Sequence, residues 1–143
     1  MAEAKTKPTV VSVRDFIATV ADAERQRDCE ALVPILERLT GSPPVMWGSS
    51  IVGFGRYEYP LASGKTGEWC ITGFSPRKSD LTLYLLAGFE QRGTQALLAK
   101  LGKHKLGKVC LYLKRLDDVD LAVLEPLIAE SIAETRRRYP SSR

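Results

Sequence analysis

The stretch PPVMWGSSIVGFGRYEYP (43–60) decides the fold class, because within it the spacing of apolar residues changes from helical to strand-like. Pro43 and Pro44 end the helical pattern that precedes it. Three short runs rich in β-forming residues follow, Val45–Trp47, Ile51–Phe54 and Arg56–Tyr59, with the turn residues Gly48-Ser49-Ser50 after the first. We therefore expect a tightly turned sheet to begin here.

The strand pattern continues to Leu86. Trp69–Phe74 and Leu81–Leu86 are two further β-rich runs, and segments 62–67 and 75–80 supply the turns before them. Connections this short favour antiparallel hairpins, because a parallel crossover needs a dozen residues or more.

Helical patterns flank this strand-rich region. Ser12 begins the first helix, and Asp15 completes a capping sequence of the S-x-x-D type. The spacing predicts further helices over Asp28–Thr40 (closed by Gly41), Glu90–Leu101 (closed by Gly102) and Asp120–Arg138, and a last strand over Lys108–Leu113. Pro34 should bend the second helix or mark its first turn. This order predicts a two-layer α+β domain, a mostly antiparallel sheet of about five to six short strands packed against helices.

The length and composition indicate one globular domain. The 143 residues fit a single domain, which we expect over 12–139, with a flexible lead at 1–11 and a tail at 140–143. The content of 44% hydrophobic and 27% charged residues excludes a disordered chain. No apolar run approaches the roughly 20 residues of a membrane span. The first residues, MAEAKTKPTVVS, lack the apolar core of a signal peptide, so we expect a cytoplasmic protein that does not bind membranes.

Basic residues concentrate in the middle of the chain. Residues 45–116 carry eleven Lys or Arg and four Asp or Glu. Between Glu90 and Asp117 there are seven basic residues and no carboxylate. Such a segment could attract anions, phosphate-bearing ligands or nucleic acid, or could equally be a solvated surface that keeps the protein soluble.

The aromatic and glycine residues of 43–60 are candidates for ligand binding. Trp47 and Tyr57 could stack on a ligand, while Gly53 and Gly55 would let it approach the backbone. Alternatively, the same residues form the contacts of a twisted hairpin, since glycine in a strand marks a bulge or a close approach.

A second candidate is the lysine-rich loop GKHKLGKVCLY (102–112). Its lysines surround Gly107 as in an anion site, although the spacing of a Walker motif is absent. Arg77 and Lys78 could join it from another loop. The full set of candidate ligand-binding residues is Trp47, Gly53, Gly55, Tyr57, Arg77, Lys78, Lys103, Lys105, Lys108 and Tyr112.

Metal binding and catalysis have little support in the residue pattern. The three cysteines stand at no metal-ligand interval, and His104 is the only histidine. The aspartates at 117, 118 and 120 are explained by helix capping. No nucleophile lies in a recognisable catalytic motif, so we expect no catalytic residues, no resident metal and no cofactor.

Three segments resemble the bacterial YdhG-like family of domains of unknown function: MWGSSIVGFGRYEY (46–59), TGFSPRKSDLTLYL (72–85) and LGKHKLGKVCLYLKRLDDVDLAVLEPLI (101–128). The resemblance extends from Val13 to Tyr139 in the same order and implies a small α+β domain with an antiparallel sheet covered by helices. One branch of the family is described as a frataxin-like intracellular iron chaperone. That activity would need clustered carboxylates, whereas the acidic residues of 15–30 are interleaved with Arg14, Arg25 and Arg27.

The sequence thus predicts a non-catalytic binding domain whose basic loops bind an anionic small molecule or protein partner. A frataxin-like iron chaperone is the first alternative. A nucleic-acid-binding accessory protein is the second, without a helix-turn-helix, RNP or zinc-finger signature. Exposed β-edges also allow a homodimer.

Overall fold

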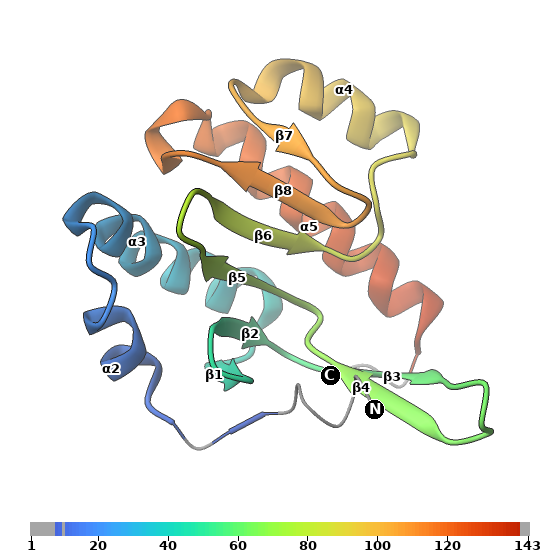
Figure 1. Ribbon diagram of the computed structural model, residues 1–143. Helices are drawn as coiled ribbons and strands as arrows, with labels where there is room; N and C mark the ends of the chain where they lie inside the picture. Colours follow the sequence, from blue (N-terminus) through green and yellow to red (C-terminus); the bar gives the residue numbers. More distant parts are fainter. Residues whose placement is uncertain (1–7, 10, 141–143) are drawn as a thin grey trace.

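A six-stranded antiparallel sheet organises the chain in the computed structural model, which describes residues 8, 9 and 11–140 (Figure 1). Its strands are β1 (Pro44–Trp47), β2 (Ile51–Phe54), β5 (Thr72–Pro76), β6 (Leu81–Leu85), β7 (Lys105–Leu106) and β8 (Cys110–Leu113). They lie in the order β1-β2-β5-β6-β8-β7, and every neighbouring pair is antiparallel. A separate hairpin, β3 (Tyr57–Pro60) and β4 (Thr66–Trp69), leaves the sheet between β2 and β5.

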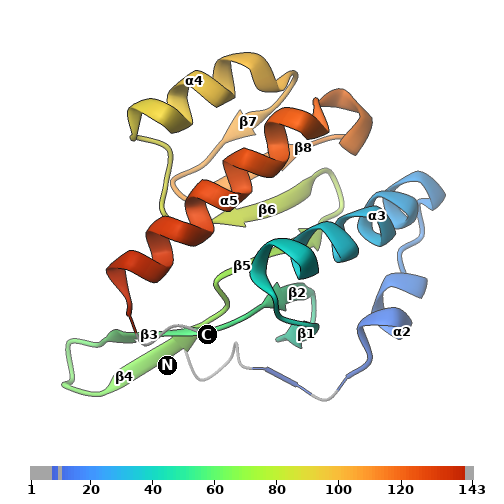
Figure 2. The ribbon, with the colours of Figure 1, turned by 180° about the vertical axis from the view of Figure 1, so that it is seen from behind.

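The helices cover one face of this sheet. They are α2 (Val13–Ala18), α3 (Ala23–Thr40), α4 (Arg92–Leu101) and α5 (Leu121–Arg138), with a 3₁₀ turn, η1 (Leu116–Asp118), before α5. Figure 1 views the sheet with α3 and α5 behind it, and Figure 2 shows these two helices in front. The expected two-layer α+β architecture is therefore confirmed. We call the face of the sheet turned away from α3 and α5 the open face.

Strand alternation separates the core from the open face. Leu81, Leu83 and Leu85 of β6 belong to the same buried cluster as Leu124 and Ile128 of α5. Because successive side chains of a strand point to opposite faces, the intervening residues of β6 lie on the open face. Burying one leucine stabilises a fold by about 1.5–3 kcal/mol, so this leucine row fixes which face of the sheet the helices cover.

The helix boundaries follow local capping. Ser12 caps α2 by accepting a hydrogen bond from the Asp15 amide at 3.2 Å. Gly41 ends α3 as expected, in the left-handed conformation (φ 73°). The expected start of α3 at Asp28 was wrong: Asp22 accepts from the Glu24 and Arg25 amides, so the helix begins at Ala23. Pro34 therefore lies inside α3 and not in its first turn.

Two strand predictions and one helix prediction need correction, and one strand was missed. The single strand expected over Trp69–Phe74 is two strands, because the chain leaves the hairpin at Trp69 and joins the main sheet at Thr72. The strand expected to begin at Lys108 begins at Cys110. The two-residue strand β7, which pairs with β8, was not predicted. The helix expected from Glu90 begins two residues later, at Arg92.

Part of the expected flexible lead is paired with the sheet. Pro8 forms an antiparallel bridge with Trp47, and the Thr9 amide donates to the Met46 carbonyl at 2.8 Å. Residues 1–7 and 10 of the lead, and 141–143 of the expected tail, lie outside the described residues.

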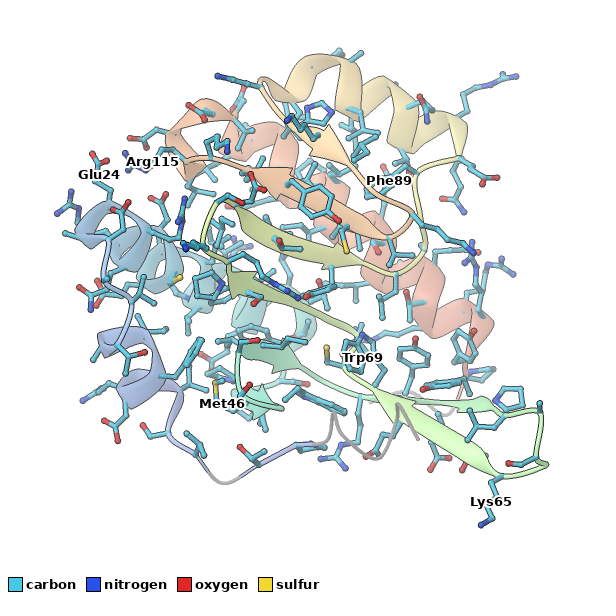
Figure 3. The ribbon with its side chains drawn as sticks, viewed as in Figure 1. Glu24, Met46, Lys65, Trp69, Phe89 and Arg115 are labelled. Carbon is cyan, nitrogen blue, oxygen red and sulfur yellow. The ribbon has the colours of Figure 1, made fainter. Side chains whose placement is uncertain are left out.

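Buried and charged contacts join α3 to the far end of β8. The carboxylate of Asp28, with a side chain only 7% exposed, accepts from Arg115 Nε at 2.9 Å and from the Leu116 amide at 2.9 Å. Glu24 also pairs with Arg115, at 3.0 Å, and Figure 3 shows these two side chains together at one end of the sheet. The hydrogen bond that Arg115 donates to Asp28 raises the pKa of Arg115. These contacts fix the position of α3 relative to the end of β8.

Within the described part of the chain, none of the helices combines the length and the apolarity needed to cross a membrane.

Candidate ligand-binding site

Trp47 and Gly53 form a close-packed unit on the open face. Trp47 is 2% exposed and meets Trp69 edge-on, with ring centroids 5.7 Å apart. A Cβ atom at Gly53 would stand 2.5 Å from Trp47 Cδ1 and 2.7 Å from Cys70 Cβ. Trp47 and Cys70 therefore already occupy the space that a side chain at position 53 would need. The structure gives Gly53 a packing role and leaves its backbone covered by Trp47.

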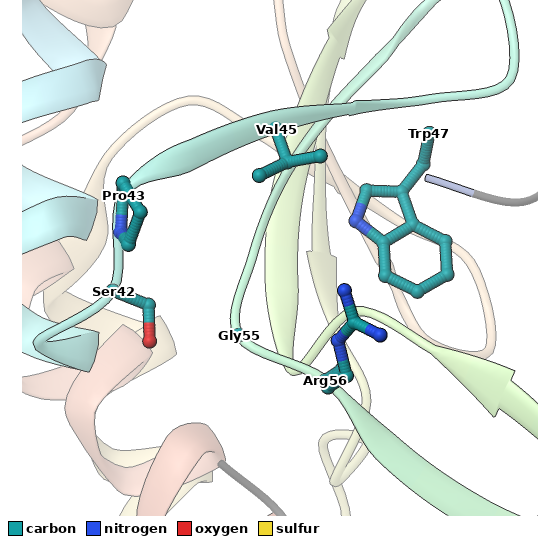
Figure 4. Close-up of a pocket in the computed structure, with 6 residues that line it drawn as sticks. All are labelled: Ser42, Pro43, Val45, Trp47, Gly55 and Arg56. Carbon is teal, nitrogen blue, oxygen red and sulfur yellow. The ribbon is translucent and has the colours of Figure 1, made fainter. Parts of the chain in front are cut away.

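Gly55 and Trp47 line a small cavity at the edge of the sheet. Gly55 adopts a left-handed conformation (φ 68°) where the chain passes from β2 to the hairpin. The cavity has a volume of about 340 Å³ and is lined by Ser42, Pro43, Val45, Trp47, Gly55 and Arg56. Figure 4 shows Ser42 and Pro43 on one side of it and Trp47 on the other. Trp47 thus has two environments, the packed layer over Gly53 and the wall of this cavity.

Tyr57 faces the end of the last helix. Its ring lies 4.6 Å from that of Tyr139, which follows α5, and 5.8 Å from that of Tyr59. Burial raises the pKa of Tyr57 well above its ordinary value. Tyr57 therefore packs the hairpin against the C-terminal end of α5.

Arg77 and two tyrosines meet in the central part of the open face. Tyr84 alternates with the core leucines of β6 and is 8% exposed. Arg77 Nη2 donates to the Tyr84 hydroxyl at 3.0 Å, and this hydrogen bond raises the pKa of Arg77. In the pairing of β6 with β8, Thr82 stands opposite Tyr112 and Tyr84 opposite Cys110. The two tyrosines are consequently diagonal neighbours, roughly 7–8 Å apart in such a ladder.

Trp69 extends this aromatic group toward the hairpin. Its ring meets that of Tyr84 edge-on at 6.3 Å, and it is half-buried, as is Tyr112 (Figure 3). The hydrogen bond with the neighbouring Cys110 thiol raises the pKa of Tyr112. Two half-exposed rings therefore flank the buried ring of Tyr84 and its bound guanidinium.

Five cations gather at one end of strands β5, β6, β8 and β7. They are Arg77 and Lys78 in the β5–β6 turn, Lys114 after β8, and Lys103 and Lys105 at β7. Lys105 stands opposite Tyr112 in the sheet. Lys114 pairs with Asp80 at 3.4 Å and donates to the Ser79 carbonyl at 3.0 Å. We call the group made by these five cations, Tyr84 and Tyr112 the basic aromatic patch.

The charge of the patch is largely uncompensated. Across residues 8, 9 and 11–140, the side chains of Arg77, Lys78, Lys103 and Lys105 enter no ion pair. The β5–β6 turn is held instead by hydrogen bonds to its backbone: Arg25 Nη1, from α3, donates to the carbonyls of Arg77 and Lys78 at 3.0 and 3.1 Å. The side chain of Lys78 is therefore left exposed.

Lys108 lies apart from the other predicted basic residues. It lines a different cavity of about 500 Å³, between the loop after β6 and the β7–β8 turn, where Arg138 also contributes. Arg138 is already paired there with Glu134 at 2.8 Å and hydrogen-bonded to the Ala87 carbonyl at 3.3 Å. The lysine-rich loop is consequently split between two places.

Sequence reasoning missed Trp69, Tyr84 and Lys114 as members of this region. Strand alternation contained the signal for Tyr84, since LTLYL (81–85) places it opposite to the core leucines. Trp69 lies in this region because it belongs to the hairpin that leaves the sheet between β2 and β5, and Lys114 because β6 pairs with β8. Local sequence patterns specify neither arrangement.

Three acidic residues at or near the start of α3 have structural partners: Asp22, Glu24 and Asp28. Asp22 caps α3, and these backbone hydrogen bonds lower its pKa. Asp28 is paired with Arg115. In the part of the chain that the structure describes, no three His, Cys, Asp or Glu side chains come together as a group that could hold a metal ion. Asp22, Glu24 and Asp28, three of the carboxylates that could serve an iron chaperone, are thus engaged in capping and ion pairing.

The thiols and the histidine are also separated. Cys29 and Cys70 are buried, and desolvation raises the pKa of each to about 12. The ring Nδ1 of His104 lies 2.7 Å from the Gly102 carbonyl. Among the three thiols, only that of Cys110 is half-exposed, and it belongs to the open face.

Fold and site together define an α+β domain with a basic, aromatic sheet surface. Comparison of the chain with protein-family models, with curated proteins and with solved structures found no match. The resemblance to YdhG-like domains accordingly stays a prediction.

Proposed function

We propose that this protein is a cytoplasmic, non-catalytic binding domain that holds an anionic ligand on the open face of its sheet. The observation that carries the proposal is the gathering of five cations beside Tyr84 and Tyr112, four of which enter no ion pair among the described residues. Cations without a carboxylate partner repel one another, and an anion that binds among them relieves this repulsion.

The rigid support of the patch favours a binding role. Arg77 is oriented by the Tyr84 hydroxyl, and its turn is fixed to α3 through Arg25. A guanidinium held in place loses little conformational entropy when it binds a carboxylate or phosphate. The four lysines of the patch are exposed, and their flexible side chains adjust to the ligand.

Charge-removing variants test the proposal. The triple variant Arg77→Gln, Lys103→Gln, Lys105→Gln should bind sodium triphosphate about tenfold more weakly than the wild type at low salt, as measured by calorimetry. A control variant that loses three exposed cations elsewhere, Lys65→Gln, Arg92→Gln, Lys100→Gln, should bind within about twofold of the wild type. Equal losses in the two variants, at unchanged melting temperature, would refute a localised site.

A further inference from the structure

We infer that the anionic ligand of the open face is single-stranded nucleic acid, which stacks bases on Trp69 and Tyr112 and places phosphates among the surrounding cations. This inference rests on the proposed function and specifies its ligand. It uses Trp69 together with the aromatic part of the patch, which a small anion would not need.

The arrangement of rings suits a strand of unpaired bases. Trp69 and Tyr112 are half-buried, so part of each ring is accessible, and they lie on either side of Tyr84. Arg77 donates a hydrogen bond to the hydroxyl of Tyr84, the ring between them. Proteins that bind single strands on a sheet combine aromatic platforms with a positively charged track along the backbone.

Charge complementarity extends beyond the immediate contacts. Lys105 stands opposite Tyr112 in the sheet, and Lys114 follows one residue after the strand that carries this tyrosine. Tyr84 and Tyr112 therefore each have a basic side chain beside them, Arg77 and Lys105 respectively. The formal net charge of +4 and the isoelectric point of about 9.0 favour a polyanion further.

The same features disfavour a duplex. The major groove of DNA admits an α-helix or a two-stranded ribbon, and the ribbon of this protein is the β3–β4 hairpin. That hairpin carries Glu58 directly opposite Glu68, which phosphates would repel. On the open face the rings of Trp69 and Tyr112 can stack only with bases that are not already stacked in a helix.

Fluorescence gives a direct test. In the variant Trp47→Phe, Trp69 is the only tryptophan, and a base stacked on it should quench its emission. We expect a ten-residue oligothymidylate to quench Trp69 saturably and to bind at least about tenfold more tightly than a duplex of the same length at the same salt concentration. Anisotropy of a labelled oligothymidylate with the wild-type protein gives the same comparison without the substitution.

Variants of the second ring separate stacking from charge. Tyr112→Ala should weaken oligothymidylate binding by about tenfold, whereas Tyr112→Phe, which keeps the ring, should stay within about twofold. Tyr59→Ala, in the hairpin, is the matched control and should also stay within about twofold. An unchanged affinity of Tyr112→Ala would overturn the inference, because binding would then depend on charge alone.

The outcomes distinguish the two proposals. If triphosphate binds as expected but oligothymidylate binds no tighter than the duplex, or leaves Trp69 emission unchanged, the nucleic-acid inference is wrong and the proposed function stands. If neither triphosphate nor oligothymidylate binds, the proposed function fails and the inference fails with it.

Discussion

The substitution Gly53→Ala tests the packing that builds the open face. The new Cβ would lie 2.5 Å from Trp47 Cδ1 and 2.7 Å from Cys70 Cβ, whereas carbon atoms in contact are about 3.5–4.0 Å apart. Both neighbours are buried, at 2% and 0% exposure, so neither can withdraw by about 1 Å without disturbing the layer above the sheet. Overpacking of this kind costs about 1–3 kcal/mol.

A smaller term opposes this cost. Alanine in a strand is favoured over glycine by roughly 0.5–1 kcal/mol, because glycine loses more backbone freedom on folding. With the overlap at the upper end of its range, the net effect is a loss of about 2 kcal/mol in the free energy of unfolding. For a domain of this size the melting temperature should fall by about 4–8 °C.

Urea denaturation followed by circular dichroism measures the effect. Gly93→Ala is the control: its Cβ would meet the carboxylate of Glu130, at 3.3 Å, and alanine is favoured over glycine in a helix by up to about 1 kcal/mol, so its stability should equal or exceed that of the wild type. In a Trp47→Ala background the cost of Gly53→Ala should fall by more than half, because one of the two clashes is removed. The same cost in both backgrounds would refute the reasoning that Trp47 occupies the space over Gly53.

Three further predictions concern the rest of the molecule. Asp28→Ala should lower the free energy of unfolding by about 3 kcal/mol, because it leaves Arg115 Nε and the buried Leu116 amide without their acceptor. Asp120→Ala, which removes only a helix cap, should lower it by about 1 kcal/mol. Equal losses for the two variants in urea denaturation would contradict this difference. Hydrogen bonds from Arg137 and Arg138 lower the pKa of Glu134 from 4.5 to about 2, so the contribution of ionised Glu134 to stability is complete above pH 4.5 and is lost as the pH falls toward 2. In Glu134→Gln the melting temperature should therefore depend less on pH over that range than in the wild type. The same pH dependence in the two proteins would argue against this reasoning. In the native protein at pH 8, Ellman's reagent should titrate one thiol quickly, that of Cys110, because the other two are buried with pKa values near 12; rapid reaction that persists in Cys110→Ser would show that this assignment is wrong.

Local sequence signals predicted most of the secondary structure. Capping and stop residues such as Ser12, Gly41 and Gly102 placed helix ends well, and Ile51–Phe54 was predicted with its observed bounds. These features depend on hydrogen bonds and backbone conformations within a few residues. The start of α3 was missed because Ala23–Arg27 is polar, and the Asp22 cap was not recognised.

Long-range pairing decided what the sequence could not predict. The division of Trp69–Phe74 into two strands follows from the hairpin leaving the sheet, which depends on partners elsewhere in the chain. The same pairing brings Arg77, Lys105 and Tyr112 together and leaves Tyr57 and Lys108 elsewhere. The residue types of the site were thus predictable, whereas the grouping of its members required the register of β5, β6, β8 and β7.

The most direct test of the account is a nuclear magnetic resonance titration of the ¹⁵N-labelled protein with oligothymidylate. We predict saturable shifts of the amide signals of Arg77, Thr82, Lys105 and Tyr112, whose residues lie together on the open face, and of the Trp69 indole signal. Signals from α3 and α5, on the opposite face, should stay in place. Shifts centred on those helices would contradict a ligand-binding open face, and no saturable shift at any signal would contradict the binding of single-stranded nucleic acid there.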